Sequence, residues 1–208
     1  MRRAFLGLPT YKTVPSASMP YHLRLAFENV SKGLLTSFCC SADLFITNAR
    51  NDIVVSCLAA YHNGDCTDLW FVDDDMKVEE GTLERLLSHR LPVVSALCRT
   101  AEGLPASFAS LSPLTRVSEE LISLSKKDGK PLSVAGVGMA CCLIDCQILE
   151  TMQRDLLGGA PAWFMITEEI DYDRKKVFRV GEDISFCRHL AEMDVPIYLD
   201  TGLVCGHR

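Results

Sequence analysis

LWFVDDD, residues 69–75, is the most informative segment of the chain. Its first four residues are apolar and bulky, which favours a strand buried on both faces. Three carboxylates follow immediately, at the carboxyl end of that strand. Parallel α/β sheets bind their ligands at the carboxyl ends of their strands. The segment therefore predicts a core strand and a binding site beside it.

Strand and helix patterns alternate around this segment. Apolar runs predict strands at 4–8, 34–45, 69–72 and 91–97, and helical spacing predicts helices at 18–28, capped by Ser18, at 51–61 and at 80–89. This order predicts an α/β fold with a mainly parallel central sheet flanked by helices.

The second half has a less regular pattern. We expect surface excursions over 99–131 with one helix at 118–125, a glycine-containing strand region at 132–144, helices at 147–157 and 184–193, and strands at 163–166 and 197–199. A length of 208 residues suits one domain, 1–208, with halves 1–98 and 99–208.

Composition excludes several classes of protein. The apolar fraction is 48% and the formal net charge is −6, with no stripe of clustered Lys and Arg, so no nucleic-acid partner is expected. No apolar run approaches the length of a membrane span. Pro9 interrupts the first apolar run too early for a signal peptide, so we expect a cytoplasmic protein.

Ten cysteines are too few for a disulfide scaffold of this length, and no C-x-x-C pair suggests a zinc ribbon. Several lie in apolar runs, such as Cys141 and Cys142. We therefore expect reduced, buried thiols.

The three carboxylates after Val72 predict a divalent-cation site. Asp73 and Asp75, two apart in an extended segment, are expected to point the same way and to share Mn²⁺ or Mg²⁺, which prefer oxygen ligands, while Asp74 points elsewhere. The alternative is a solvated acidic turn that caps the next helix.

Five segments together resemble the nucleotide-sugar glycosyltransferases of the A-type fold. FVDDDM (71–76) is similar to their D-x-D motif, LGLPTY (6–11) to the loop that holds the nucleotide base, and ITNARND (46–52) to the A-R-N segment before the D-x-D strand. VGEDISFCRHL (180–190) resembles the segment of the catalytic carboxylate, and YLDTGLVCGH (198–207) the tail whose His completes the metal site. The pattern looks closest to small enzymes of phages and large DNA viruses.

For the donor, the resemblance implies a set of nucleotide-sugar contacts and a third metal ligand, His207. The expected nucleotide-sugar contacts are Pro9, Thr10, Tyr11, Asp43, Arg50 and Asp74. Arg50 would pair with the diphosphate through its planar fork; the alternative is an ordinary ion pair with Asp52 or Asp43. The acidic-Gly-Ser segment that usually follows the second strand in this family is missing.

For the acceptor, the resemblance implies that Asp183 is the general base and that Glu182 positions the acceptor, with helix capping as the alternative role of both. Gly136 and Gly138 would let the sugar approach the backbone, or form a strand bulge. Trp163 would stack on a sugar face, or pack in the core.

The expected activity is a hexosyl or deoxyhexosyl transfer from a nucleoside-diphosphate sugar, with UDP as the expected nucleotide, to a hydroxyl of a glycan or glycoprotein, with inversion. The alternatives are a retaining transferase on the same fold, a nucleotidyltransferase, and a carbohydrate-binding or virion module without catalysis. Because His207 stands next to the last residue, we also expect a fragment of a longer protein, against a compact enzyme that ends at Arg208.

Overall fold

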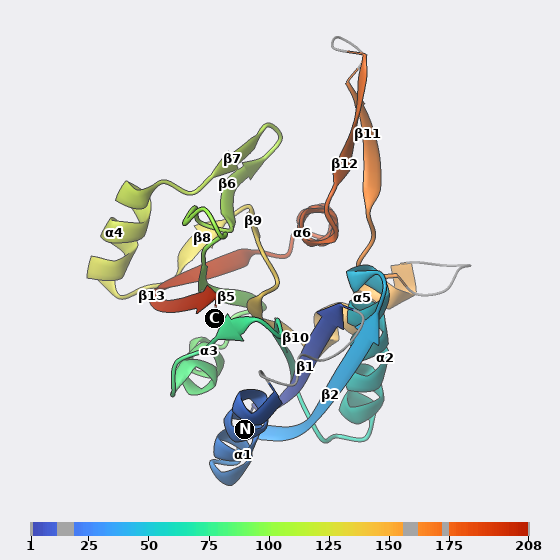
Figure 1. The fold of residues 1–208 in the computed structure, drawn as a ribbon, viewed down its shortest axis with the longest axis vertical. Helices are drawn as coiled ribbons and strands as arrows, with labels where there is room; N and C mark the ends of the chain where they lie inside the picture. The colour runs from blue at the N-terminus through green and yellow to red at the C-terminus, as the bar shows by residue number, and fades with distance from the viewer. Residues whose placement is uncertain (1, 12–18, 156–161, 172–174, 208) are drawn as a thin grey trace.

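The computed structural model describes residues 2–11, 19–155, 162–171 and 175–207. One eight-stranded sheet forms its centre, in the order β2-β1-β3-β10-β5-β13-β4, with β8 paired to β13 (Figure 1). The strands are β1 (Ala4–Tyr11), β2 (Leu35–Asp43), β3 (Asp68–Val72), β4 (Met76–Lys77), β5 (Val93–Cys98), β6 (Ser107–Leu111), β7 (Leu114–Arg116), β8 (Leu132–Val134), β9 (Gly136–Val137), β10 (Cys141–Asp145), β11 (Thr167–Asp171), β12 (Lys176–Val180) and β13 (Ile197–His207). The helices are α1 (Met19–Ser31), α2 (Ile46–His62), α3 (Thr82–His89), α4 (Glu119–Asp128), α5 (Cys146–Asp155) and α6 (Glu182–Glu192).

The sheet is mainly parallel in strand direction. β2, β1, β3, β5 and β13 run the same way, and β10, β4 and β8 run against them. The sequence predicts the parallel α/β sheet, and the structure confirms it. β10 lies between β3 and β5, although it begins at Cys141, 43 positions after β5 ends at Cys98. Local periodicity in the sequence cannot predict such a long-range pairing.

Alternate residues of β3 build the two halves of the core. Leu69 and Phe71 pack on the face that α2, α5 and α6 cover, while Trp70 and Val72 pack on the face of α1 and α3. All four side chains are buried. The period of two along a strand thus places helices on both faces.

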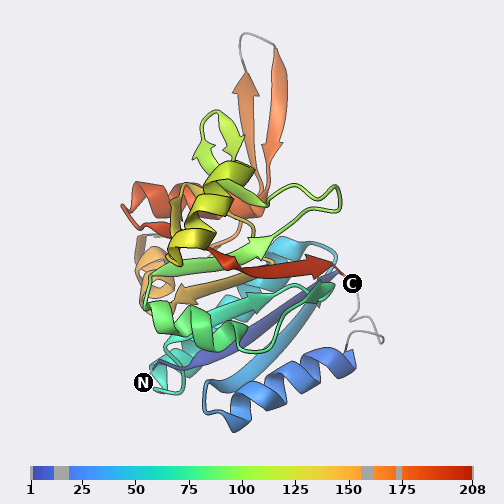
Figure 2. The ribbon, with the colours of Figure 1, turned by 90° about the vertical axis from the view of Figure 1, so that its left-hand side faces the viewer.

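Residues 99–131 and 162–180 form more structure than the sequence predicts. β6 and β7 form one hairpin, and β11 and β12 form another that projects away from the sheet (Figures 1 and 2). α4 follows β7 in the chain, and its N-cap residue is Ser118, whose Oγ accepts a hydrogen bond from the Leu121 N–H at 3.3 Å. That cap confirms the predicted helix start, although the helix continues to Asp128.

Several predicted boundaries are wrong. The first strand does not end at Leu8 but continues through Tyr11, because it pairs with β2 as far as Asp43. The region 132–144 is divided into β8, β9 and β10, which pair with different strands. Residues 163–166 are not a strand. The helix predicted at 51–61 begins earlier, at Ile46.

Two sequence predictions fall on residues outside the described ranges, namely the Ser18 cap and the end of the helix expected at Leu157. Within the described residues, no helix has both the length and the apolar character needed to span a bilayer.

Candidate active site

Arg50 is the centre of a buried ionic network at the carboxyl end of β3. Its Nη1 donates to Glu182 Oε1 at 2.8 Å and to Asp183 Oδ1, and its Nη2 donates to Asp73 Oδ1 at 3.2 Å. The Arg50 side chain is only 3% exposed. Asp73 directly follows β3, and Glu182 and Asp183 begin α6, so one guanidinium joins segments more than 100 residues apart.

The segment around Arg50 explains how this side chain is held. Arg50 lies in α2, and its guanidinium carbon is 5.8 Å from the centre of the Phe164 ring. The neighbouring Asn51 fixes Phe164, since it donates to the Phe164 carbonyl and accepts from the Phe164 N–H, both at 3.0 Å. The alternative role of Arg50, an ion pair with Asp52 or Asp43, is not the one found, because its guanidinium bonds to Asp73, Glu182 and Asp183.

The charges in this network do not cancel. Three carboxylates against one guanidinium leave a formal charge of −2 when all are ionised. Burial raises the pKa of Asp183 to about 6, with Arg50 opposing the shift and Glu182 and Asp73 adding to it. Burial also raises the pKa of Asp73, again against the effect of Arg50. An excess of negative charge favours a bound cation.

Asp183 lies at the start of α6. Gly181 is the N-cap residue, and Glu182 and Asp183 stand in the first turn, where carboxylates interact favourably with the helix dipole. The second oxygen of Asp183 accepts the backbone N–H of Met139 at 3.3 Å. Both carboxylate oxygens of Asp183 therefore have a donor.

The geometry expected for Asp73 and Asp75 is wrong. The chain is not extended here: it turns at Asp74 and Asp75, and the Met76 N–H donates to the Asp73 carbonyl at 3.1 Å. The rule that residues i and i+2 share a face holds only in a strand. Asp73 consequently faces Arg50, and the Asp75 side chain is 60% exposed.

Asp75 and His207 lie together although 132 residues separate them. His207 Nδ1 is 3.2 Å from Asp75 Oδ2, and His207 Nε2 is 2.9 Å from the Arg99 carbonyl oxygen. β13 brings His207 there by pairing with Met76 of β4. Behind the same turn, His22 Nε2 is 3.0 Å from the Asp74 carbonyl oxygen.

The donors at this edge fit Mn²⁺ or Mg²⁺ in part. Two ligands at right angles around such an ion lie about 3 Å apart, given bonds of roughly 2.1 Å. The Asp75 and His207 pair has this spacing. Asp73 is at the same strand end but bonds to Arg50. Among the described residues, Asp73, Asp75 and His207 do not form a group of ligand atoms within 4.8 Å of one another.

A cavity of about 210 Å³ opens beside the two α6 carboxylates. Glu182, Asp183 and Gly138 line it together with Phe108 and Arg116 from the β6–β7 hairpin. A Cβ built on Gly138 would lie 3.6 Å from Asp183 Oδ2, so a larger side chain there would occupy this space. The volume of this cavity is below the ~300–1,000 Å³ of pockets that hold a whole ligand. It suits one small ring or the end of a ligand chain.

Four of the six residues expected to contact the nucleotide sugar lie at the ends of β1 and β2, whereas Arg50 lies in α2 and Asp74 in the turn after β3. Pro9 and Thr10 are buried, whereas Tyr11 is 59% exposed and pairs in register with Asp43. Asp43 Oδ1 accepts from the Phe45 N–H at 2.9 Å, so it also fixes the start of α2. Of this set, Tyr11 offers the largest accessible surface.

Two of the sugar-contact residues have packing roles. Trp163 is 2% exposed and donates its indole N–H to the Leu149 carbonyl at 2.8 Å, so the structure places it in the core. A Cβ on Gly136 would lie 2.9 Å from Leu111 Cδ2, which makes this glycine a site of close packing. Of the two glycines, Gly138 is the one beside Asp183.

Sequence reasoning missed the backbone groups that complete the site. The Met139 N–H and the Arg99 carbonyl carry no side-chain signature. Phe164, beneath Arg50, belonged to a segment expected as a strand.

No family model and no curated protein sequence matches the chain. Solved structures do match. The A197 protein from STIV superposes with a TM-score of 0.59 at 15% identity, over 100% of this chain and 86% of A197. GalNAc-T7, solved with UDP, GalNAc and Mn²⁺, superposes with a TM-score of 0.54 at 9% identity, over 100% of this chain and 44% of its own.

This chain therefore spans less than half of the GalNAc-T7 chain. At these identities the likeness concerns the fold. The chain has the mixed α/β fold of these two proteins, with a mainly parallel sheet that resembles that of an A-type glycosyltransferase.

Proposed function

We propose that this protein is a metal-dependent, cytoplasmic glycosyltransferase that moves a hexosyl or deoxyhexosyl group from a UDP-sugar to a hydroxyl of a glycan or glycoprotein. The glycosyltransferase-like fold supports the reaction class. The Mn²⁺ and UDP of GalNAc-T7 belong to that protein and suggest the same chemistry here. The ten cysteines are free of disulfide bonds, which supports a location in the cytoplasm, because that compartment keeps thiols reduced.

One observation carries the proposal: Arg50 gathers Asp73, Glu182 and Asp183 at a single edge of the sheet. Holding three partly buried carboxylates around one buried guanidinium costs free energy, which a purely structural site has little reason to retain. Parallel sheets bind ligands at this edge. The residual charge of the network favours a dication over a second anion.

Asp75 and His207 would hold Mn²⁺ or Mg²⁺, with Asp73 beside them. A bound dication would supply Lewis-acid stabilisation of the departing diphosphate. The protein's own contribution is position: the turn at Asp74 presents Asp75, and β13 presents His207 opposite it.

Asp183 would accept the proton of the acceptor hydroxyl while that hydroxyl attacks the anomeric carbon with inversion. A pKa raised to about 6 suits a base that works near neutral pH. The cavity beside Gly138 would receive the reacting end of the acceptor. A groove of about 340 Å³ between the β6–β7 and β11–β12 hairpins shares Gly181 and Ile184 with that cavity and would hold the rest.

A retaining transferase is the second candidate, and one observation favours it. Arg50 and the Met139 N–H occupy both oxygens of Asp183, as expected for a carboxylate with a structural role. In that case Asp183 would orient Arg50 and would not take a proton. The configuration of the product at the anomeric carbon, read by proton NMR early in the reaction, distinguishes the two mechanisms.

The reaction class is tested by a screen of nucleotide sugars for donor hydrolysis, with Mn²⁺, with Mg²⁺ and with a chelator. We expect nucleoside diphosphate release from a UDP-sugar only when a metal is present. A second assay supplies a nucleoside triphosphate together with a sugar phosphate. Pyrophosphate release in that assay would instead identify a nucleotidyltransferase. If no donor is hydrolysed and carbohydrate binding does not depend on metal, the binding-module alternative replaces our proposal.

A further inference from the structure

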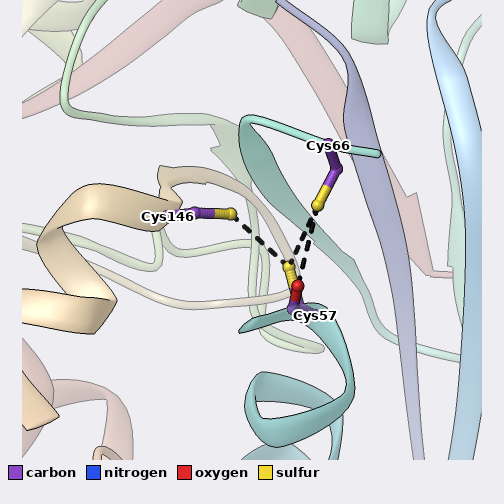
Figure 3. Close-up of side chains that lie close together, drawn as sticks. All are labelled: Cys57, Cys66 and Cys146. Atoms are coloured by element: carbon purple, nitrogen blue, oxygen red, sulfur yellow. Dashed lines mark hydrogen bonds between the residues drawn. The ribbon is translucent and has the colours of Figure 1, made fainter. Parts of the chain in front are cut away.

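A second cluster of metal-binding side chains lies away from this edge. The Cys57 Sγ is 3.5 Å from Cys146 Sγ and 4.0 Å from Cys66 Sγ (Figure 3). All three sulfur atoms lie within 4.8 Å of one another, and all three residues are buried. Cys57 comes from α2, Cys66 from the loop before β3, and Cys146 from the start of α5.

The cluster is at the opposite end of β3 from the carboxylates. Asp145 pairs with Asp68 at the first residue of β3, whereas Cys141 pairs with Val72 at its last residue. A five-residue strand spans about 16 Å. The mechanism proposed above uses none of the three thiols.

The spacing of the sulfur atoms matches a thiolate metal site. With metal–sulfur bonds of about 2.3 Å, neighbouring thiolates lie roughly 3.8 Å apart in tetrahedral geometry and 4.0 Å apart in trigonal geometry. The Cys57–Cys66 and Cys57–Cys146 sulfur distances, 4.0 Å and 3.5 Å, fall close to these values. Among the described residues, no His, Asp or Glu joins the group as a fourth ligand.

A cationic side chain lies near the cluster. The Arg3 guanidinium is close enough to Cys66 to act on it electrostatically. Arg3 is held nearby by the Gly64 carbonyl, to which its Nη2 donates at 2.9 Å. One cation beside three thiolates reduces the charge that a bound metal must offset.

We propose that Cys57, Cys66 and Cys146 form a structural site for one soft, thiophilic metal ion, either Cu⁺ or Zn²⁺. Thiolate ligands select these ions over Mg²⁺ and Mn²⁺, so the site is distinct from that of the catalytic metal. On binding, three S–H protons pass to solvent and three metal–sulfur bonds form, without change of oxidation state. The ion would tie α2 and α5 to the start of β3 and stabilise the native fold.

The test uses the full chain, purified under reducing, anaerobic conditions and stripped with a chelator. Cu⁺ is titrated against a chromogenic competitor, and Co²⁺ serves as the optical probe for the Zn²⁺ arm. We expect one equivalent of Cu⁺ or Co²⁺ with sulfur-to-metal charge-transfer absorption, and a higher Tm. If Cu⁺ binds with the three thiolates as its only ligands, the site is assigned to Cu⁺. If Co²⁺ binds with a tetrahedral spectrum, the site is assigned to Zn²⁺.

Matched variants assign the sulfur atoms. Cys57→Ala should abolish the one-equivalent uptake, and Cys66→Ser, in a loop before β3, gives the same test if Cys57→Ala fails to fold. The control is Cys141→Ala, which removes a buried thiol that hydrogen-bonds with Cys205 elsewhere in the core and should bind normally. Uptake unchanged in both cluster variants overturns the proposal. So does a reduced wild-type protein that binds neither ion but forms a Cys57–Cys146 disulfide in air.

Discussion

The two ends of β3 each carry an Arg–Asp contact, but the two contacts differ in charge and exposure. At the carboxyl end, Arg50 holds three carboxylates, Asp73, Glu182 and Asp183. At the amino end, Asp68 is fully buried, and Arg2 Nε donates to it at 2.9 Å and Thr67 Oγ1 at 2.6 Å. Arg2 Nη2 also donates to Asp145 at 3.2 Å, so one guanidinium holds two carboxylates there. The larger excess of negative charge lies at the carboxyl end, where a bound cation would offset it.

Exposure and the number of carboxylates separate a structural charge cluster from one that merits a functional interpretation. Asp68 is fully buried, whereas the side chains of Asp73, Glu182 and Asp183 are 26%, 17% and 28% exposed. One further carboxylate joins the Arg–Asp contact at the amino end and two join it at the carboxyl end. The carboxyl end also has a cavity and an exposed Asp–His pair beside it. These features, and not burial alone, mark the candidate active site.

The largest expected effect comes from Arg50→Met, which leaves three carboxylates without their shared cation. Loss of one partner of a buried ion pair costs about 3–5 kcal/mol. Urea denaturation at neutral pH measures the free energy of unfolding. Arg24→Met removes only an exposed ion pair with Glu28 and should give no measurable change. Equal stability of the two variants would mean that the network contributes nothing to folding.

Next in size is Asp183→Asn, which should slow sugar transfer by roughly 10²-fold or more and leave donor affinity nearly intact. Steady-state kinetics and calorimetry separate the two effects. Asp68→Asn is the control at the other end of β3: it should destabilise the fold by about 1–3 kcal/mol without slowing transfer by the folded protein. Normal transfer by Asp183→Asn would favour the retaining mechanism, and loss of transfer only in Glu182→Gln would identify Glu182 as the base.

A smaller effect is expected of Asp75→Asn, which should weaken metal-dependent donor binding by at least about 10-fold while the fold stays stable. Asp75 is exposed and contacts His207, so little packing is lost. Calorimetry of a UDP-sugar with Mn²⁺ gives the affinity, and Glu79→Gln, which changes an exposed carboxylate outside the named site, is the control. Unchanged affinity in Asp75→Asn would remove this residue from the metal site.

The smallest effect concerns pH. The pKa of Asp183 is raised to about 6, so as pH falls through 6 the carboxylate gains a proton and can no longer accept one. The rate of transfer should therefore rise with pH and level off above this value. Glu182 contributes to the raised pKa, and Glu182→Gln should move the midpoint to lower pH. A pH profile of kcat/KM at saturating metal measures both, and an unmoved midpoint would exclude this coupling.

Elements whose evidence is local could be predicted from the sequence. The apolar run 69–72 predicted β3, and the carboxylates after it predicted a site at its carboxyl end. The helix expected at 118–125 matches α4, and its N-cap hydrogen bond from Leu121 N–H to Ser118 Oγ spans only three residues. The parallel α/β architecture follows from the order of such elements.

Which distant groups meet is set by the tertiary structure. Arg50 was expected to bind a phosphate or a neighbour, and it bonds instead to Asp73 after β3 and to residues of α6. Trp163 was expected either to stack on a sugar or to pack in the core, and it packs in the core. Cys57, Cys66 and Cys146 come together through three separate elements. The physical reason is that periodicity and capping act within a few residues, whereas strand order and charge pairing depend on contacts between segments far apart in the chain.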